Sequence, residues 1–163
     1  MNNYGNTGTK TDLLAVDPHN EFFELVEKPF DKYNNAKKLI INTFFFSPKS
    51  ALLLLQKGIF KQQQLSNAIK LCFQDYRRSL VERYVGNDDG SINFTNFFIM
   101  LCYAIDFYSN DYQIWFTGVD VNGRGDMMKT NDIWLKNHSC AGEVEEALLN
   151  QFMDNNIIHQ LWK

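Results

Sequence analysis

Two loops hold most of the side chains in this chain whose types and spacing could support chemistry. The first covers residues 85–96 and the second covers residues 120–131, and each has a glycine at its sixth position. Their candidate metal ligands are Asn87, Asp89, Asn93, Asp120, Asn122 and Asn131. Side-chain oxygens at alternate loop positions around a glycine turn suit Ca²⁺, which takes six to eight oxygen ligands.

The first loop also carries the apolar residues that such a site needs at its flanks. Asn87-Asp88-Asp89-Gly90-Ser91-Ile92-Asn93-Phe94, followed by Phe97, resembles the loop and exiting helix of the EF-hand superfamily. A second copy begins 35 residues further on, with Met127 in the place of Ile92. The resemblance covers residues 50–136 and is to a degenerate member, of the penta-EF, calpain-type or myosin-light-chain-like kind. It implies an all-α fold of helix–loop–helix pairs, with a short β-bridge between Ile92 and Met127.

Both loops depart from the ligand pattern at the positions that matter most for charge. Val85 occupies the first position of the first loop, and Asn96 and Asn131 replace the bidentate glutamate of the last position. Arg124 places a fixed positive charge at the fifth position of the second loop. We therefore expect vestigial sites and no cofactor, with weak calcium sensing through residues 120–131 as the alternative.

The periodicity of apolar residues predicts mostly helices after a flexible tail over residues 1–11. Residues 39–46 suit a helix or a strand equally, because they are rich in β-branched and aromatic side chains. We expect one domain over residues 12–163, which could be divided into lobes at 12–64 and 65–163. The predicted helices cover residues 20–26, 50–56, 64–85, 96–116 with an interruption at 109–111, 130–136 and 142–161.

Aromatic residues make up 15% of the chain, which is more than one small core requires. Most should be buried, but the surplus could line a groove that takes an amphipathic helix of a partner. The candidate partner-binding residues are Phe97, Phe98, Trp115, Phe116, Trp134 and Trp162.

Other kinds of site have little support. The three cysteines lie far apart, the three histidines belong to no catalytic motif, and Glu145-Glu146 suggests a solvated helix face. The net charge of −3 gives no broad positive field for nucleic acid. No apolar run approaches the roughly 20 residues of a membrane span, so a cytoplasmic protein is expected.

These patterns together predict a non-enzymatic, EF-hand-like adaptor or regulatory light-chain-like subunit that binds protein, alone or as a homo- or hetero-oligomer, and is insensitive to calcium. Besides weak calcium sensing, two further alternatives stay open. The chain could be a small helical inhibitor of the immunity-protein type, or a structural subunit of a large assembly.

Overall fold

The computed structural model describes residues 13–16, 18, 36–44, 46–86, 90–117, 119, 121 and 139–161. The chain divides into two compact units, Met1–Gln74 and Asp75–Lys163. The described residues contain five helices and five strands, arranged as a three-stranded and a two-stranded sheet. The fold is therefore mixed α/β, and the predicted all-α class is wrong.

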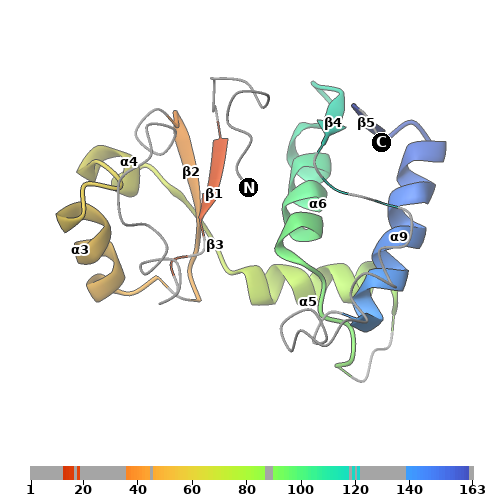
Figure 1. Cartoon of the computed structure of the whole chain (residues 1–163), viewed down its shortest axis with the longest axis horizontal. Coiled ribbons are helices and arrows are strands. Elements are labelled where there is room, and N and C mark those ends of the chain that lie inside the picture. The colour runs from red at the N-terminus through yellow and green to blue at the C-terminus, as the bar shows by residue number, and fades with distance from the viewer. Residues whose placement is uncertain are drawn as a thin grey trace. The chain divides into compact units, whose positions relative to one another are not determined.

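The first unit is built on a parallel sheet in the order β1 (Leu13–Val16), β2 (Lys38–Asn42), β3 (Ile69–Leu71), which Figure 1 shows in red, orange and yellow-green. Two helices, α3 (Pro48–Gln56) and α4 (Gln62–Ser66), connect β2 to β3. Leu39, Ile40 and Ile41 of β2 are fully buried although successive side chains point to opposite faces. Both faces of the central strand are thus covered, as is usual in parallel sheets.

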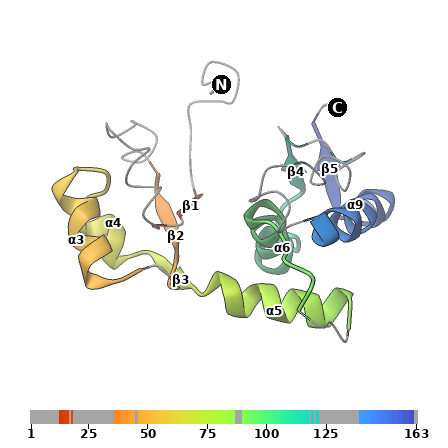
Figure 2. The ribbon, with the colours of Figure 1, turned by 60° about the horizontal axis from the view of Figure 1, so that its bottom comes forward.

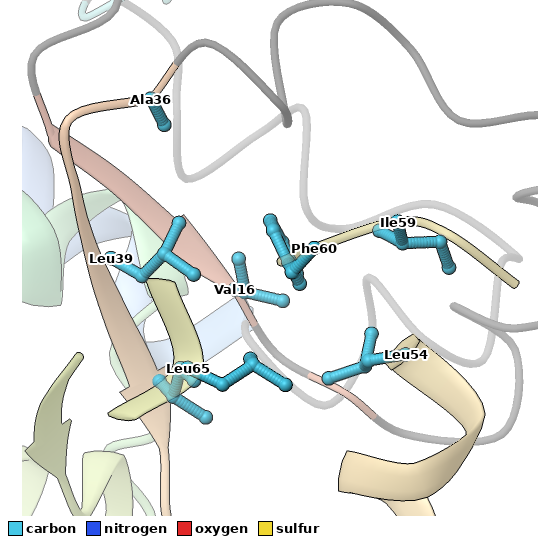
Figure 3. Packing of buried hydrophobic residues seen from close by; sticks show 8 residues of the cluster. Val16, Ala36, Leu39, Leu54, Ile59, Phe60 and Leu65 are labelled. Atoms are coloured by element: carbon cyan, nitrogen blue, oxygen red, sulfur yellow. The ribbon is translucent and has the colours of Figure 1, made fainter. Parts of the chain in front are cut away.

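One core cluster joins the sheet to these two helices, and Figure 3 shows side chains from β1, β2, α3, α4 and the turn after α3 meeting in it. Its members are Val16, Ala36, Leu39, Ile41, Leu54, Ile59, Phe60 and Leu65. Near the cluster, buried Asn42 accepts backbone hydrogen bonds from Phe44 (3.2 Å) and Phe73 (3.1 Å) through Oδ1. This amide ties the end of β2 to the segment that follows β3.

Short-range signals fix both ends of α3. Ser47 is the N-cap, and it exchanges side-chain and backbone hydrogen bonds with Ser50. At the other end Gly58 has φ +64°, and its N–H donates to the Leu55 carbonyl while the Ile59 N–H donates to Leu54. This pair of bonds is the Schellman motif, in which glycine supplies the left-handed residue that stops a helix.

The second unit contains most of α5 (Phe73–Tyr84), followed by α6 (Asn96–Tyr108), β4 (Ile114–Phe116), α9 (Ser139–Asp154) and β5 (Ile158–Gln160). Figures 1 and 2 show α6 beside α9, with β4 beside β5 at one end of both helices. Phe98 of α6 and Phe152 of α9 stack with ring centroids 6.3 Å apart and planes 10° apart. The ring centroid of Phe94 lies 4.7 Å from that of Phe98, so aromatic rings form much of this core.

Several observed elements differ from the predicted ones because strands pair with segments far away in the sequence. The helix predicted over residues 64–85 is in fact the end of α4, the strand β3 and α5, because Ile69–Leu71 hydrogen-bonds to β2. Residues 39–46 contribute a strand, and the helix predicted over 96–116 ends at Tyr108 before β4. The helix predicted over 142–161 ends at Asp154, and β5 follows it.

Two predictions within these segments are confirmed, and others cannot be compared. The helix over residues 50–56 is α3, and the predicted interruption at 109–111 is a turn in which Asp111 N–H donates to the Tyr108 carbonyl. The tail over residues 1–11 and the helices over 20–26 and 130–136 lie outside the described residues. No helix among the described residues is long and apolar enough to cross a membrane.

Candidate protein-binding surface

The two-stranded sheet of the second unit places aromatic and aliphatic side chains on its outward face. β4 and β5 are parallel, with Trp115 paired to His159 and Phe116 to Gln160. Side chains alternate between faces along a strand, so the burial of Phe116 and Ile158 fixes which face is inward. Trp115 and His159 consequently lie on the outward face.

Trp115 is the largest apolar side chain on this face. It is 52% exposed, and its ring centroid lies 4.7 Å from that of His159 at an interplanar angle of 34°. Leu161 follows His159 by two positions, which returns it to the same face, and it is 49% exposed. We call Trp115, His159 and Leu161 the Trp115 surface.

Backbone and side-chain hydrogen bonds hold the Trp115 surface in a fixed shape. The Leu161 N–H donates to the Phe116 carbonyl at 3.0 Å, which continues the strand pairing past β5. Gln160 Nε2 donates to the Val119 carbonyl, also at 3.0 Å, and so fastens the chain beyond β4. A partner that docks here would meet side chains on paired strands, which lowers the entropy cost of binding.

The turn between α9 and β5 sets the direction in which β5 leaves the helix. Asn156 has φ +57°, and its N–H donates to Met153 while the Ile157 N–H donates to Phe152. These bonds form a second Schellman motif with asparagine in the left-handed position, which asparagine tolerates better than most residues.

The structure separates the predicted partner-binding aromatics into different environments. Phe98 and Phe116 are buried core residues and offer no surface to a partner. Phe97 is partly buried, with its ring 6.0 Å from that of Phe116. Trp115 alone among the four described candidates is exposed, and Trp134 and Trp162 lie outside the described residues.

The described end of the first predicted calcium loop is organised around an arginine. Arg77 Nε donates to the Phe94 carbonyl at 2.9 Å, and its Nη2 donates to Asn96 Oδ1 at 3.3 Å. Asn96, which stands at the last position of the predicted loop, therefore faces a guanidinium and begins α6, which has Thr95 as its N-cap. Ile92 lies in none of the described strands, and Met127, its expected bridge partner, lies outside the described residues.

Of the six predicted calcium ligands, one lies within the described residues. Asn93 is partly buried just before α6, whereas the other five lie outside the described residues. These five are Asn87, Asp89, Asp120, Asn122 and Asn131. Within the described ranges no three His, Cys, Asp or Glu side chains gather where they could hold a metal ion.

A buried carboxylate that sequence reasoning placed on a solvated face joins α9 to α6. Glu145 is 0% exposed, and it accepts hydrogen bonds from the backbone N–H of Thr95 and from Thr95 Oγ1, the latter at 3.0 Å. Thr95 Oγ1 in turn accepts from the Phe98 N–H at 3.3 Å and caps α6. The interpretation of Glu145-Glu146 as a solvated pair is thus wrong for Glu145. The spacing of Ala141, Glu145 and Leu148 on the apolar side of α9 was the signal that could have revealed it.

A second polar cluster joins α5 to α6. Arg83 Nη1 donates to both carboxylate oxygens of Asp106, at 2.8 and 3.0 Å, and Tyr76 donates its hydroxyl to the same carboxylate. Burial and the hydrogen bond to Asp106 raise the pKa of Tyr76, and the hydrogen bond to Asp106 raises the pKa of Arg83. Burial also raises the pKa of the Cys102 thiol to about 12, which keeps it protonated and unsuited to nucleophilic chemistry at neutral pH.

Comparison with known proteins identifies no relative of this chain, and the EF-hand relationship stays a prediction. No family model, no curated protein and no solved structure matches the chain.

Proposed function

We propose that the protein is a non-enzymatic adaptor or regulatory subunit, and that the Trp115 surface is where a partner protein docks. The observation that carries this proposal is the half-exposed indole of Trp115, which packs at a tilt against the His159 ring on the outward face of a paired sheet. A large apolar ring held in water costs free energy that contact with a partner recovers.

The chemistry of the Trp115 surface favours protein as the ligand. Tryptophan is among the residues that contribute most to binding at protein interfaces, because it buries a large area with few rotatable bonds. Leu161 extends the apolar area, and His159 supplies a polar ring edge beside the indole. A surface of this kind suits the apolar face of an amphipathic helix.

The charge of the second unit indicates which partner helix would fit. Residues 75–163 contain thirteen acidic and seven basic side chains. A partner with basic residues flanking its apolar face would be attracted at long range, and its association rate would fall as salt is raised. The proposed partner is therefore a basic amphipathic helix.

The hydrogen bonds of Arg77 support the calcium-insensitive form of this proposal. The guanidinium donates to Asn96 Oδ1, the side-chain oxygen at the last ligand position of the loop, and to the neighbouring Phe94 carbonyl. Its fixed positive charge also opposes a cation nearby. The adaptor would then hold its partner whether calcium is present or not.

Site-specific photocrosslinking in cells tests the docking surface. A photoreactive residue replaces Gln113, which is exposed two positions before Trp115, and in a control chain it replaces exposed Glu82 on α5. We expect a discrete adduct from position 113, absent from position 82 and lost when Trp115→Ala is added. The proposal fails if position 113 gives no adduct, or if the adduct persists in the Trp115→Ala chain.

A further inference from the structure

The two units differ sharply in the sign of their charge, although the net charge of the chain is small. Residues 1–74 contain nine lysines, no arginine and six acidic residues, all six of the acids lying at or before Asp31. No acidic residue occurs between Lys32 and Gln74. The described part of this stretch has six lysines, and all six are exposed: Lys37, Lys38, Lys49, Lys57, Lys61 and Lys70.

Helix α3 presents apolar side chains to water within this basic unit. Leu52 is 53% exposed and Leu55 is 38% exposed, whereas Leu54 on the opposite side of the helix is buried in the core cluster. Residues three apart lie on one helical face, so Lys49, Leu52 and Leu55 form a continuous row. We call this row the α3 face.

From these features we infer that the α3 face attaches the first unit to the surface of an anionic lipid bilayer. Leu52 and Leu55 would enter the boundary between headgroups and acyl chains, while Lys49 would extend its flexible stem toward the lipid phosphates. The other exposed lysines need no direct contact, because the field of a charged bilayer acts over roughly a Debye length, about 8–10 Å.

The composition of the unit favours lipid over nucleic acid. Arginine, whose planar fork matches phosphate and guanine most closely, is absent from the first unit, so all its basic side chains apart from histidine are lysines. Two exposed leucines contribute nothing to the stacking that bases require. Aliphatic side chains next to lysines are instead the combination that binds a membrane surface, where neither signal is sufficient alone.

Co-sedimentation of the full chain with vesicles tests this inference. Vesicles of phosphatidylcholine alone are compared with vesicles that also contain phosphatidylserine, at low and at physiological salt. We expect binding only to the anionic vesicles, and weaker binding at the higher salt concentration. The absence of binding to anionic vesicles at low salt would overturn the proposal.

Substitutions distinguish vesicle binding through the α3 face from general electrostatic attraction by the lysines. Leu52→Ala with Leu55→Ala should weaken vesicle binding by about tenfold, and Lys49→Gln by about fivefold. Gln63→Ala, at an exposed position on α4, should leave binding unchanged, and circular dichroism should show all variants folded. Vesicle binding that is indifferent to both α3 variants would refute docking through this helix.

Competition by other polyanions decides between partner classes. A single-stranded oligonucleotide and polyglutamate are added separately to the vesicle-bound chain, and their direct binding is measured by fluorescence anisotropy. We expect weak binding that does not change in the Leu52→Ala, Leu55→Ala chain. If either polymer binds more tightly than the vesicles and loses that binding in the double variant, the α3 face serves nucleic acid or acidic protein, and the lipid proposal is wrong.

Discussion

Removal of the buried Glu145 carboxylate should strongly destabilise the second unit. In the native state this carboxylate is 0% exposed and accepts two hydrogen bonds from Thr95. Glu145→Ala leaves the Thr95 N–H without its acceptor inside the protein and leaves a void between α6 and α9. Hydrogen bonds to charged groups contribute about 1.5–3 kcal/mol each, and an unpaired buried donor adds a further penalty. We expect the free energy of unfolding to fall by about 3–5 kcal/mol.

The distribution of tryptophan makes this measurement specific to one unit. All three tryptophans, Trp115, Trp134 and Trp162, belong to residues 75–163. Urea unfolding followed by tryptophan fluorescence therefore reports the second unit, and far-UV circular dichroism reports both. Because a domain is typically stable by only about 5–15 kcal/mol, the loss should move the fluorescence midpoint far toward zero urea.

Two control substitutions distinguish the loss of the buried hydrogen-bond acceptor from a general effect of substitution on α9. Glu146→Ala, one residue further along the same helix and partly exposed, should change the free energy of unfolding by less than about 0.5 kcal/mol. Glu145→Gln keeps one acceptor oxygen and should cost about 1–2 kcal/mol. A loss of less than about 1 kcal/mol in Glu145→Ala, or an equal loss in Glu146→Ala, would contradict the role assigned to the buried carboxylate.

Three further predictions follow from burial, ionisation and backbone conformation. Phe98→Ala should lower the free energy of unfolding by about 3–5 kcal/mol, whereas Trp115→Ala should lower it by about 1 kcal/mol or less. Urea unfolding measures both losses, and equal losses would contradict the burial of Phe98 and the exposure of Trp115. Burial raises the pKa of Cys102 from 9.0 to about 12, so its stabilising contribution is complete below about pH 9 and is lost as the pH rises toward 12. The thermal midpoint of Cys102→Ala should accordingly fall less steeply above pH 9 than that of the native chain, and parallel curves would disprove the assignment. Gly58→Ala should cost about 1–2 kcal/mol from the left-handed φ alone, since the added Cβ would meet no atom within 4 Å; a neutral effect on urea unfolding followed by circular dichroism would contradict this.

Local signals in the sequence were sufficient where a structure depends on adjacent residues. The helix over residues 50–56 could be predicted because its leucines, the Ser47-Pro48 start and the Lys57-Gly58 stop are contiguous. The interruption at residues 109–111 could be predicted for the same reason. The oxygen-rich composition of the first calcium-like loop was also evident, but composition does not reveal which side chain faces those oxygens.

Tertiary structure decided the features that depend on residues far apart in the chain. Ile69–Leu71 fits a helical pattern equally well and is a strand only because β2 lies beside it, 29 positions away in register. Glu145 appears solvated beside Glu146, and only the packing of α9 on α6 brings Thr95 to its carboxylate. In the same way, Trp115 and Phe116 are adjacent aromatics whose exposures differ because pairing with β5 turns one outward and the other inward. Local sequence patterns were enough to predict α3, the turn at residues 109–111 and the abundance of aromatic side chains. The sheets, the buried carboxylate and the exposed face depend on contacts between residues far apart in the chain.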